Sequence, residues 1–174
     1  MALQDRKTFV QQSLFASLSI FLPVSSAQAA KYGSFGSDSP AVLDPAKAVV
    51  DSTLLQSESV RKAFTSLSQY RDTVSAMKST LLSDRQANLA PTIRSKLDFV
   101  ALRTDLNTVN GVFDEDTQRG TDRIIRIILQ DITELETANR QKEGIARSDR
   151  RVETMLAKLN KLEQAFSDYL AFAK

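Results

Sequence analysis

The chain has 174 residues, of which 42% are apolar and 25% are charged, a balance typical of one folded globular domain. It contains no Cys, no His and no Trp. The lack of Cys excludes a disulfide scaffold, and the lack of Cys and His removes the usual ligands of zinc, haem, blue-copper and di-iron sites. Nucleophiles that depend on His are excluded for the same reason, so no catalytic metal site and no cofactor is expected.

The charge of the chain is nearly balanced. The formal net charge is +2, and residues 31–174 hold 21 basic against 20 acidic residues. A protein that binds nucleic acid usually carries a marked basic excess to neutralise phosphates. No nucleic-acid partner is therefore expected.

Residues 1–30 have the order of features found in a cleavable signal. Arg6 and Lys7 are followed by an apolar run over 14–22, by Pro23, and by Ala27-Gln28-Ala29, an A-x-A cleavage motif. The alternative is a transmembrane anchor, but a run of roughly 10 residues is shorter than the ~20 that a helix needs to cross a bilayer. We therefore expect an exported protein that is peripheral to the membrane after signal removal.

Residues 31–44 are rich in Gly, Ser and Asp and predict an extended N-terminal tail. Its aromatic residues, Tyr32 and Phe35, are expected to anchor the tail either on a partner or on the folded domain. Asp44 and Pro45 then predict a helix N-cap with Pro in the first helical position, followed by a short helix to about Leu55.

From residue 60 onward the apolar residues recur at spacings of three and four, the pattern of amphipathic helices. The first stripe is Val60, Phe64, Leu67, Tyr70, Val74, Met77 and Leu81, and a turn is expected from Asp84 to Pro91. The second stripe is Phe99, Leu102, Leu106, Val109 and Phe113, and a polar loop is expected from Asp114 to Gly120.

The third segment, 124–135, is rich in Ile and apolar on more than one side, which predicts the most buried helix. Gly144 breaks the chain. The last stripe is Val152, Met155, Leu159, Leu162, Phe166, Tyr169 and Ala173, with Phe166, Tyr169 and Phe172 expected in the core or at its end. These patterns predict an all-α fold in which residues 45–174 form an up-down-up-down four-helix bundle.

Clusters of charge have alternative interpretations. The acidic residues at 114–116 and at Glu134 and Glu136 fit either a calcium or magnesium site or a solvated surface. The basic residues Arg147, Arg150 and Arg151, and likewise Arg119, Arg123 and Arg126, fit either a docking patch for an acidic partner or a solvated face with helix-surface ion pairs. A solvated surface is the simpler interpretation in each case.

The stretch Leu102-Arg103-Thr104-Asp105-Leu106-Asn107-Thr108-Val109 resembles the L-R-x-D-L-x-T-V stretch of the PsbQ family of photosystem II extrinsic proteins. Those subunits are lumenal four-helix bundles with a flexible N-terminal tail and an A-x-A thylakoid signal. The cyanobacterial members are lipoproteins with a Cys at the cleavage site. Because this chain has no Cys, it resembles the algal or plastid members instead, including the four-helix extrinsic protein of diatoms.

The resemblance implies a non-catalytic subunit in the thylakoid lumen that docks on the photosystem II membrane core and its other extrinsic subunits. It would protect the oxygen-evolving cluster and help to retain calcium and chloride. Lys31, Tyr32 and Phe35 of the tail, with Arg103 and Asp105 of the motif, would be the partner-binding residues.

The chain departs from the family in two respects. It lacks the Pro-rich tail of plant members, and only five residues precede Arg6 where a stroma-targeting region is expected, so either the N-terminus is truncated or the resemblance fails there.

Two other functions remain open. An exported helical-bundle binding or assembly protein unrelated to photosynthesis, in the periplasm or secreted, fits the same signal and stripes. A small helical enzyme similar to chorismate mutase would need several Arg and a Glu or Gln turned into one core, whereas these stripes are almost purely apolar.

Overall fold

The computed structural model describes residues 41–142 and 144–172. They form a 3-10 helix, η1 (Pro45–Lys47), and the α-helices α3 (Ser52–Leu55), α4 (Glu58–Ser83), α5 (Ala90–Lys96), α6 (Phe99–Asn110), α7 (Glu115–Asn139) and α8 (Asp149–Ala171). No strand occurs in this part of the chain, apart from an isolated bridge between Val50 and Phe113, so the predicted all-α class is confirmed. The predicted signal at 1–30 and residues 31–40 of the predicted tail lie outside the described residues.

Side chains that cap helix N-termini decide where most of the long helices begin. Ser57, Asp98 and Asp114 each accept a hydrogen bond from the backbone N–H three residues later, at the start of α4, α6 and α7. The predicted polar loop from Asp114 to Gly120 is therefore wrong. Asp114 is the cap, and the acidic residues after it form the first turn of α7, where negative charge is favoured by the helix dipole.

The short helix predicted from Asp44 to Leu55 is also interrupted. Asp44 caps η1 by accepting a hydrogen bond from the Ala46 N–H at 3.0 Å, as predicted. The chain then becomes extended and pairs with the segment after α6. The Asp51 N–H donates to the Val112 carbonyl at 2.8 Å, and the Asp114 N–H donates to the Val49 carbonyl at 3.1 Å. These long-range bonds replace the helical bonds that a continuous helix would need.

The turn predicted from Asp84 to Pro91 ends early because Pro91 lies in the first turn of α5. A Pro there loses no hydrogen bond, since the first N–H groups of a helix have no partner within it. Leu97 then leaves the helical conformation and separates α5 from α6. Phe99, predicted as part of the buried second stripe, is 43% exposed.

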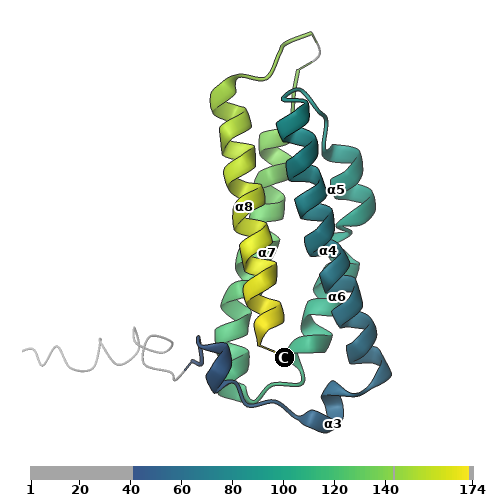
Figure 1. The fold of residues 1–174 in the computed structure, drawn as a ribbon, viewed down its shortest axis with the longest axis vertical. Coiled ribbons are helices and arrows are strands. Elements are labelled where there is room, and N and C mark those ends of the chain that lie inside the picture. Colours follow the sequence, from purple (N-terminus) through teal and green to yellow (C-terminus); the bar gives the residue numbers. More distant parts are fainter. Residues whose placement is uncertain (1–40, 143, 173–174) are drawn as a thin grey trace, which may run out of the picture. The chain divides into compact units, whose positions relative to one another are not determined.

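Helices α4 to α8 pack side by side and form what we call the helical body. Contacts join α7 to α8, α8 to α4, α4 to α6 and α6 to α7, and α5 also lies on α7. Helices α4 and α7 run in one direction, and α6 and α8 run in the other (Figure 1). The break at Gly144, which has a φ of 74°, lies between α7 and α8 as predicted.

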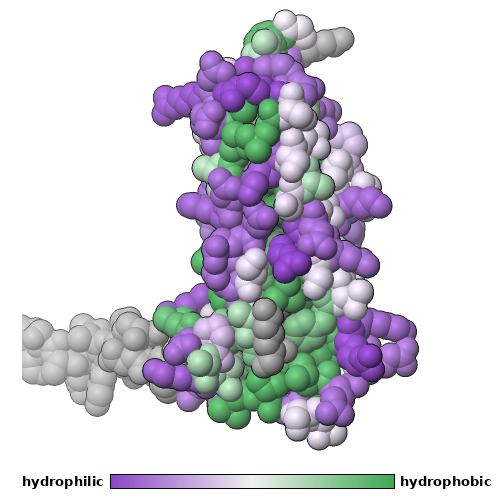
Figure 2. Space-filling model, in the orientation of Figure 1, coloured by the Kyte–Doolittle hydropathy of each residue, from purple (hydrophilic) through white to green (hydrophobic). Residues whose placement is uncertain are grey.

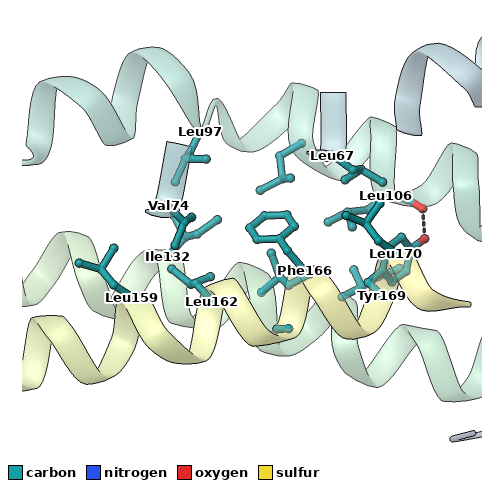
Figure 3. Close-up of a cluster of buried hydrophobic side chains, with 14 of the residues drawn as sticks. Leu67, Val74, Leu97, Leu106, Ile132, Leu159, Leu162, Phe166, Tyr169 and Leu170 are labelled. Atoms are coloured by element: carbon teal, nitrogen blue, oxygen red, sulfur yellow. Dashed lines mark hydrogen bonds between the residues drawn. The ribbon is translucent and has the colours of Figure 1, made fainter. Parts of the chain in front are cut away.

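Most of the core comes from the predicted stripes, and Leu89, Ile93 and Leu97, in and beside α5, are core residues that no predicted stripe contains. In Figure 3 the ring of Phe166 lies among Leu67, Leu106 and Leu162, from α4, α6 and α8. The Tyr169 hydroxyl donates to the Leu106 carbonyl at 2.6 Å, so the polar end of this buried ring has an acceptor. Phe166, Tyr169 and Phe172 are all buried, as predicted. Each fully buried side chain of this size contributes about 1.5–3 kcal/mol.

Helix α7 has nine buried residues, slightly more than the eight of α8, in line with the expectation for 124–135. It is not apolar on every side, however. In α7, Ile125, Ile128 and Ile132 face the core, but Ile127 is 49% exposed. Arg123 and Arg126 are exposed on the same helix. The helix is thus amphipathic, like its neighbours, with one Ile on its solvent side.

Candidate interaction surface

The described part of the interior holds few polar groups, and their side chains are hydrogen-bonded either to one another or to neighbouring groups. The buried polar residues are Asn110, Thr117, Thr121, Asp131, Asn139 and Arg147. The Thr121 hydroxyl donates to the Asn110 side chain, whose amide donates to Asp122 at 3.0 Å. These contacts connect the end of α6 to the beginning of α7. Within the described residues, no group of several Arg with a Glu or Gln faces one interior pocket.

A groove with a volume of about 430 Å³ lies between α7 and α8. Lys158 crosses it, donating to the largely buried Asp131 at 2.9 Å and also forming an ion pair with Glu134. The hydrogen bond from Lys158 lowers the pKa of Glu134, and the bond to Glu134 raises the pKa of Lys158. This triad holds α7 against α8.

The two motif residues of the predicted partner-binding set have different surroundings. Asp105 accepts a hydrogen bond from the Tyr70 hydroxyl at 3.0 Å, which joins α6 to α4. Burial, the hydrogen bond to Asp105 and the charges of Asp105 and Asp98 raise the pKa of Tyr70 to about 12. Arg103 is exposed and has no ion pair within the described chain. Asp105 thus has a clear role inside the fold, and Arg103 is available at the surface.

The remaining predicted binding residues, Lys31, Tyr32 and Phe35, lie outside the described residues. The predicted set is therefore not tested as one surface.

The acidic clusters that raised the possibility of a calcium site are engaged in local contacts. Asp114 caps α7, and Glu115 and Asp116 form ion pairs with Arg119. Glu136 accepts hydrogen bonds from Arg94. Among the described residues, no cluster of three or more Asp, Glu, His or Cys is placed to hold a metal ion.

Arg147 is only 6% exposed. It therefore does not belong to the solvated basic face that the cluster of Arg147, Arg150 and Arg151 suggests. Its guanidinium donates to the carbonyls of Arg85 and Ala87 at 3.1 and 3.0 Å and to the Asn139 carbonyl at 3.3 Å. Burial lowers the pKa of Arg147, and the charge of Arg151 adds to this effect. The side chain therefore ties the α4–α5 and α7–α8 connections together. A local pattern of Arg spacing gives no sign of this role, because the partners lie about 60 residues away.

Charge is segregated along the helical body, although it is balanced overall. The end formed by the described residues 84–96, 136–142 and 144–153, the basic end, holds eight basic and four acidic residues. The opposite end, formed by 41–62, 110–122 and 164–172, holds four basic and eight acidic residues. Helix α7 has 25 residues and separates the two ends by about 37 Å. The sequence alone hides this segregation, because the charges of each end come from separate parts of the chain.

Both ends also expose aliphatic side chains. Ile145 is 59% exposed in the loop of the basic end, and Leu82 is 61% exposed nearby at the end of α4. Leu43, Val49 and Leu54 are 61%, 58% and 48% exposed at the acidic end. In Figure 2 a small hydrophobic area lies at the upper tip, above hydrophilic helix ends, and a larger one lies at the lower end. The two ends are thus the candidate interaction surfaces.

No helix in the described part of the chain combines the length and the hydropathy needed to cross a membrane. Comparison of the chain with family models, with curated proteins and with solved structures found no match.

Proposed function

We propose that this chain is a non-catalytic extrinsic subunit that docks on the lumenal side of photosystem II. The single observation that carries the proposal is the Leu102–Val109 stretch and its place in the fold. Its apolar positions, Leu102, Leu106 and Val109, are fully buried in α6. Asp105 bonds to α4 and Arg103 is left at the surface, so the motif residues separate into packing and exposed positions.

The arrangement of the helices supports the four-helix bundle that such a subunit requires. Helices α4, α7 and α8 are three of its members, and α5 and α6 together make the fourth, broken at Leu97. The order of contacts around the body, α4–α6–α7–α8–α4, is that of an up-down-up-down bundle with short connections.

A bundle of this kind acts by occupying a surface. When it binds the complete form of photosystem II and not the depleted form, it stabilises the complete form by mass action. A bound subunit also shields the oxygen-evolving cluster from reductants and slows the loss of calcium and chloride. The tail residues Lys31, Tyr32 and Phe35, together with Arg103, would contact the membrane core and the other extrinsic subunits in the thylakoid lumen.

The test is rebinding to photosystem II membranes of a red-lineage alga from which high salt or alkaline Tris has removed the extrinsic proteins. The proposal predicts saturable binding of the added protein, measured by sedimentation, and its release by the same salt wash. Arg103→Gln should weaken this binding. Arg61→Gln, at an exposed Arg of α4 that also has no side-chain partner among the described residues, should not. A chain that sediments equally with and without membranes contradicts the proposal.

An exported binding or assembly protein unrelated to photosynthesis is the alternative. Cross-linking in native membranes separates the two, because the alternative predicts that the recovered partner is not a photosystem II subunit.

A further inference from the structure

The loop between α7 and α8 and the first turn of α8 carry a group of exposed side chains with no partner among the described residues. Arg140, Lys142 and Arg150 are exposed, and Ile145 between them is 59% exposed. We call these four residues the cationic tip. Figure 1 shows that this loop extends past the ends of α4 and α8.

The cations of the tip differ from most others at the basic end. Arg85 pairs with Asp149 and Glu153, and Arg94 pairs with Glu136. Arg147 and Arg151 donate to backbone carbonyls. Arg140, Lys142 and Arg150, by contrast, have no hydrogen bond or ion pair from their side chains to any described residue. Their charge is therefore not neutralised by any described residue.

The base of the tip is held in place by hydrogen bonds. The Gln141 side chain donates to the Ile145 carbonyl at 2.7 Å, and the Arg147 N–H donates to the Gln86 side chain at 2.7 Å. The Arg147 side chain also donates to two carbonyls of the α4–α5 connection. Both the backbone and the side chain of Arg147 therefore attach the loop to that connection. Ile145 is thus held outward and is not free to fold back onto the core.

We propose that the cationic tip binds the surface of an anionic lipid bilayer, with Ile145 entering the headgroup region. Basic residues around an exposed aliphatic side chain are the combination that favours this region, where charge and apolar surface are both accommodated. A projecting tip has no cavity for a ligand, and a fluid bilayer needs no matching concave shape. The opposite, acidic end of the body is repelled by the same lipid, so the helices stand with the basic end toward the membrane.

The expected strength follows from the number of charges. Each Lys or Arg close to an anionic surface strengthens binding about fivefold at moderate salt. Removing all three cations should therefore weaken binding about 100-fold. Binding should also fall as salt rises, because exposed charges are screened.

The test uses the full chain and two kinds of vesicle, one of phosphatidylcholine alone and one of phosphatidylcholine and phosphatidylglycerol in equal parts. The test variant is Arg140→Gln, Lys142→Gln, Arg150→Gln. The matched control, Arg61→Gln, Arg123→Gln, Arg126→Gln, removes the same charge from exposed residues away from the tip, one at the acidic end and two on α7, whose side chains have no partner among the described residues. Residues 1–40 are the same in all proteins, so their contribution to binding is constant.

The orientation can be measured separately, since the chain has no Cys. Ile145→Cys and Leu54→Cys place one environment-sensitive fluorophore at the basic or the acidic end. The proposal predicts a blue shift with phosphatidylglycerol vesicles for the label at 145 and none for the label at 54. It also predicts that the triple variant loses binding while the control retains it.

Equal loss of binding in the two triple variants, no preference for phosphatidylglycerol, or equal shifts at 145 and 54 would each overturn the proposal. Binding to membranes that contain protein but not to vesicles would assign the tip to an acidic protein instead. The vesicles contain no protein, so failure to bind them would overturn the lipid proposal and leave the photosystem II proposal standing.

Discussion

Replacement of Gly120 by Ala should detach the segment that precedes η1 from the helical body. Gly120 lies in α7, and the Val42 carbonyl lies directly over it. A Cβ atom at position 120 would be 1.8 Å from the Val42 oxygen and 2.8 Å from the Val42 carbonyl carbon. Real contacts of this kind are longer than 3.0 Å, so the segment must move away.

The size of the effect follows from the contacts that would be lost. The Val42 N–H donates to the Asp116 carbonyl at 3.0 Å, a bond with a net contribution of about 1 kcal/mol. Val42 is half-buried against the core, which contributes about 1 kcal/mol more. Against this loss of about 2 kcal/mol, Ala at position 120 favours the helix by about 1 kcal/mol. The free energy of global unfolding should therefore fall by no more than about 1 kcal/mol, while local opening becomes at least about tenfold more frequent.

Hydrogen exchange of the Val42 amide measures the local effect, and thermal unfolding measures the global one. Exchange at Val42 should rise about tenfold or more, and Tm should change by less than about 4 °C. Gly111→Ala is the matched control, because a Cβ there meets its nearest atom at 3.5 Å and the φ of Gly111 is −67°. An unchanged exchange rate at Val42 in Gly120→Ala, or a loss of Tm well beyond 4 °C, would refute the reasoning.

Three further predictions concern the polar contacts between helices. The pKa of Tyr70 in the folded state is raised to about 12 from 10.0. The contribution of Tyr70 to the free energy of unfolding is therefore complete below pH 10 and should be lost between pH 10 and 12. In Asp105→Asn, titration followed by absorbance should find a lower pKa for Tyr70. Arg147→Met should lower the free energy of unfolding by about 2–3 kcal/mol in urea titrations, because the carbonyls of two connections lose their donors. Lys158→Met should lower it by about 2–3 kcal/mol at pH 7, because the buried Asp131 loses its counter-charge.

The two predictions on the free energy of unfolding, for Arg147→Met and Lys158→Met, each have a control. Arg150→Met and Lys161→Met change exposed side chains next to Arg147 and Lys158 and should leave stability nearly unchanged. The pKa of Glu134 is lowered by Lys158, so the stability that this pair supplies is present at neutral pH and is lost as pH falls through the pKa of Glu134. A difference between wild type and Lys158→Met that stays constant down to acid pH would contradict the assignment of this pair. Equal effects of Arg147→Met and Arg150→Met would contradict the role given to Arg147.

The helices were predictable where local periodicity decides the structure. Leu67, Leu106 and Leu162 all belong to stripes with spacings of three and four, and all are fully buried. The errors lie where contacts distant in sequence decide. Residues 48–51 lie within a segment whose sequence predicts a helix. Their backbone hydrogen bonds to residues 112–114 hold them extended instead.

The candidate surfaces were less predictable than the core. Arg147 and Arg150 look equivalent in sequence, yet one is buried between two connections and the other is exposed. The segregation of charge depends on which helix ends meet, and a balanced composition does not reveal it. The hydrogen bond between Asp105 and Tyr70 likewise joins residues 35 positions apart.

The central claim, a docking subunit that supports oxygen evolution, is tested most directly by activity at limiting chloride and calcium. Photosystem II membranes stripped of extrinsic proteins should be assayed for oxygen evolution with and without the added chain, at low and at saturating concentrations of both ions. The account predicts a rise in activity at low ion concentrations that disappears at saturation, because the subunit retains ions and performs no chemistry. No rise at low ion concentrations, with the protein present in excess, would contradict it.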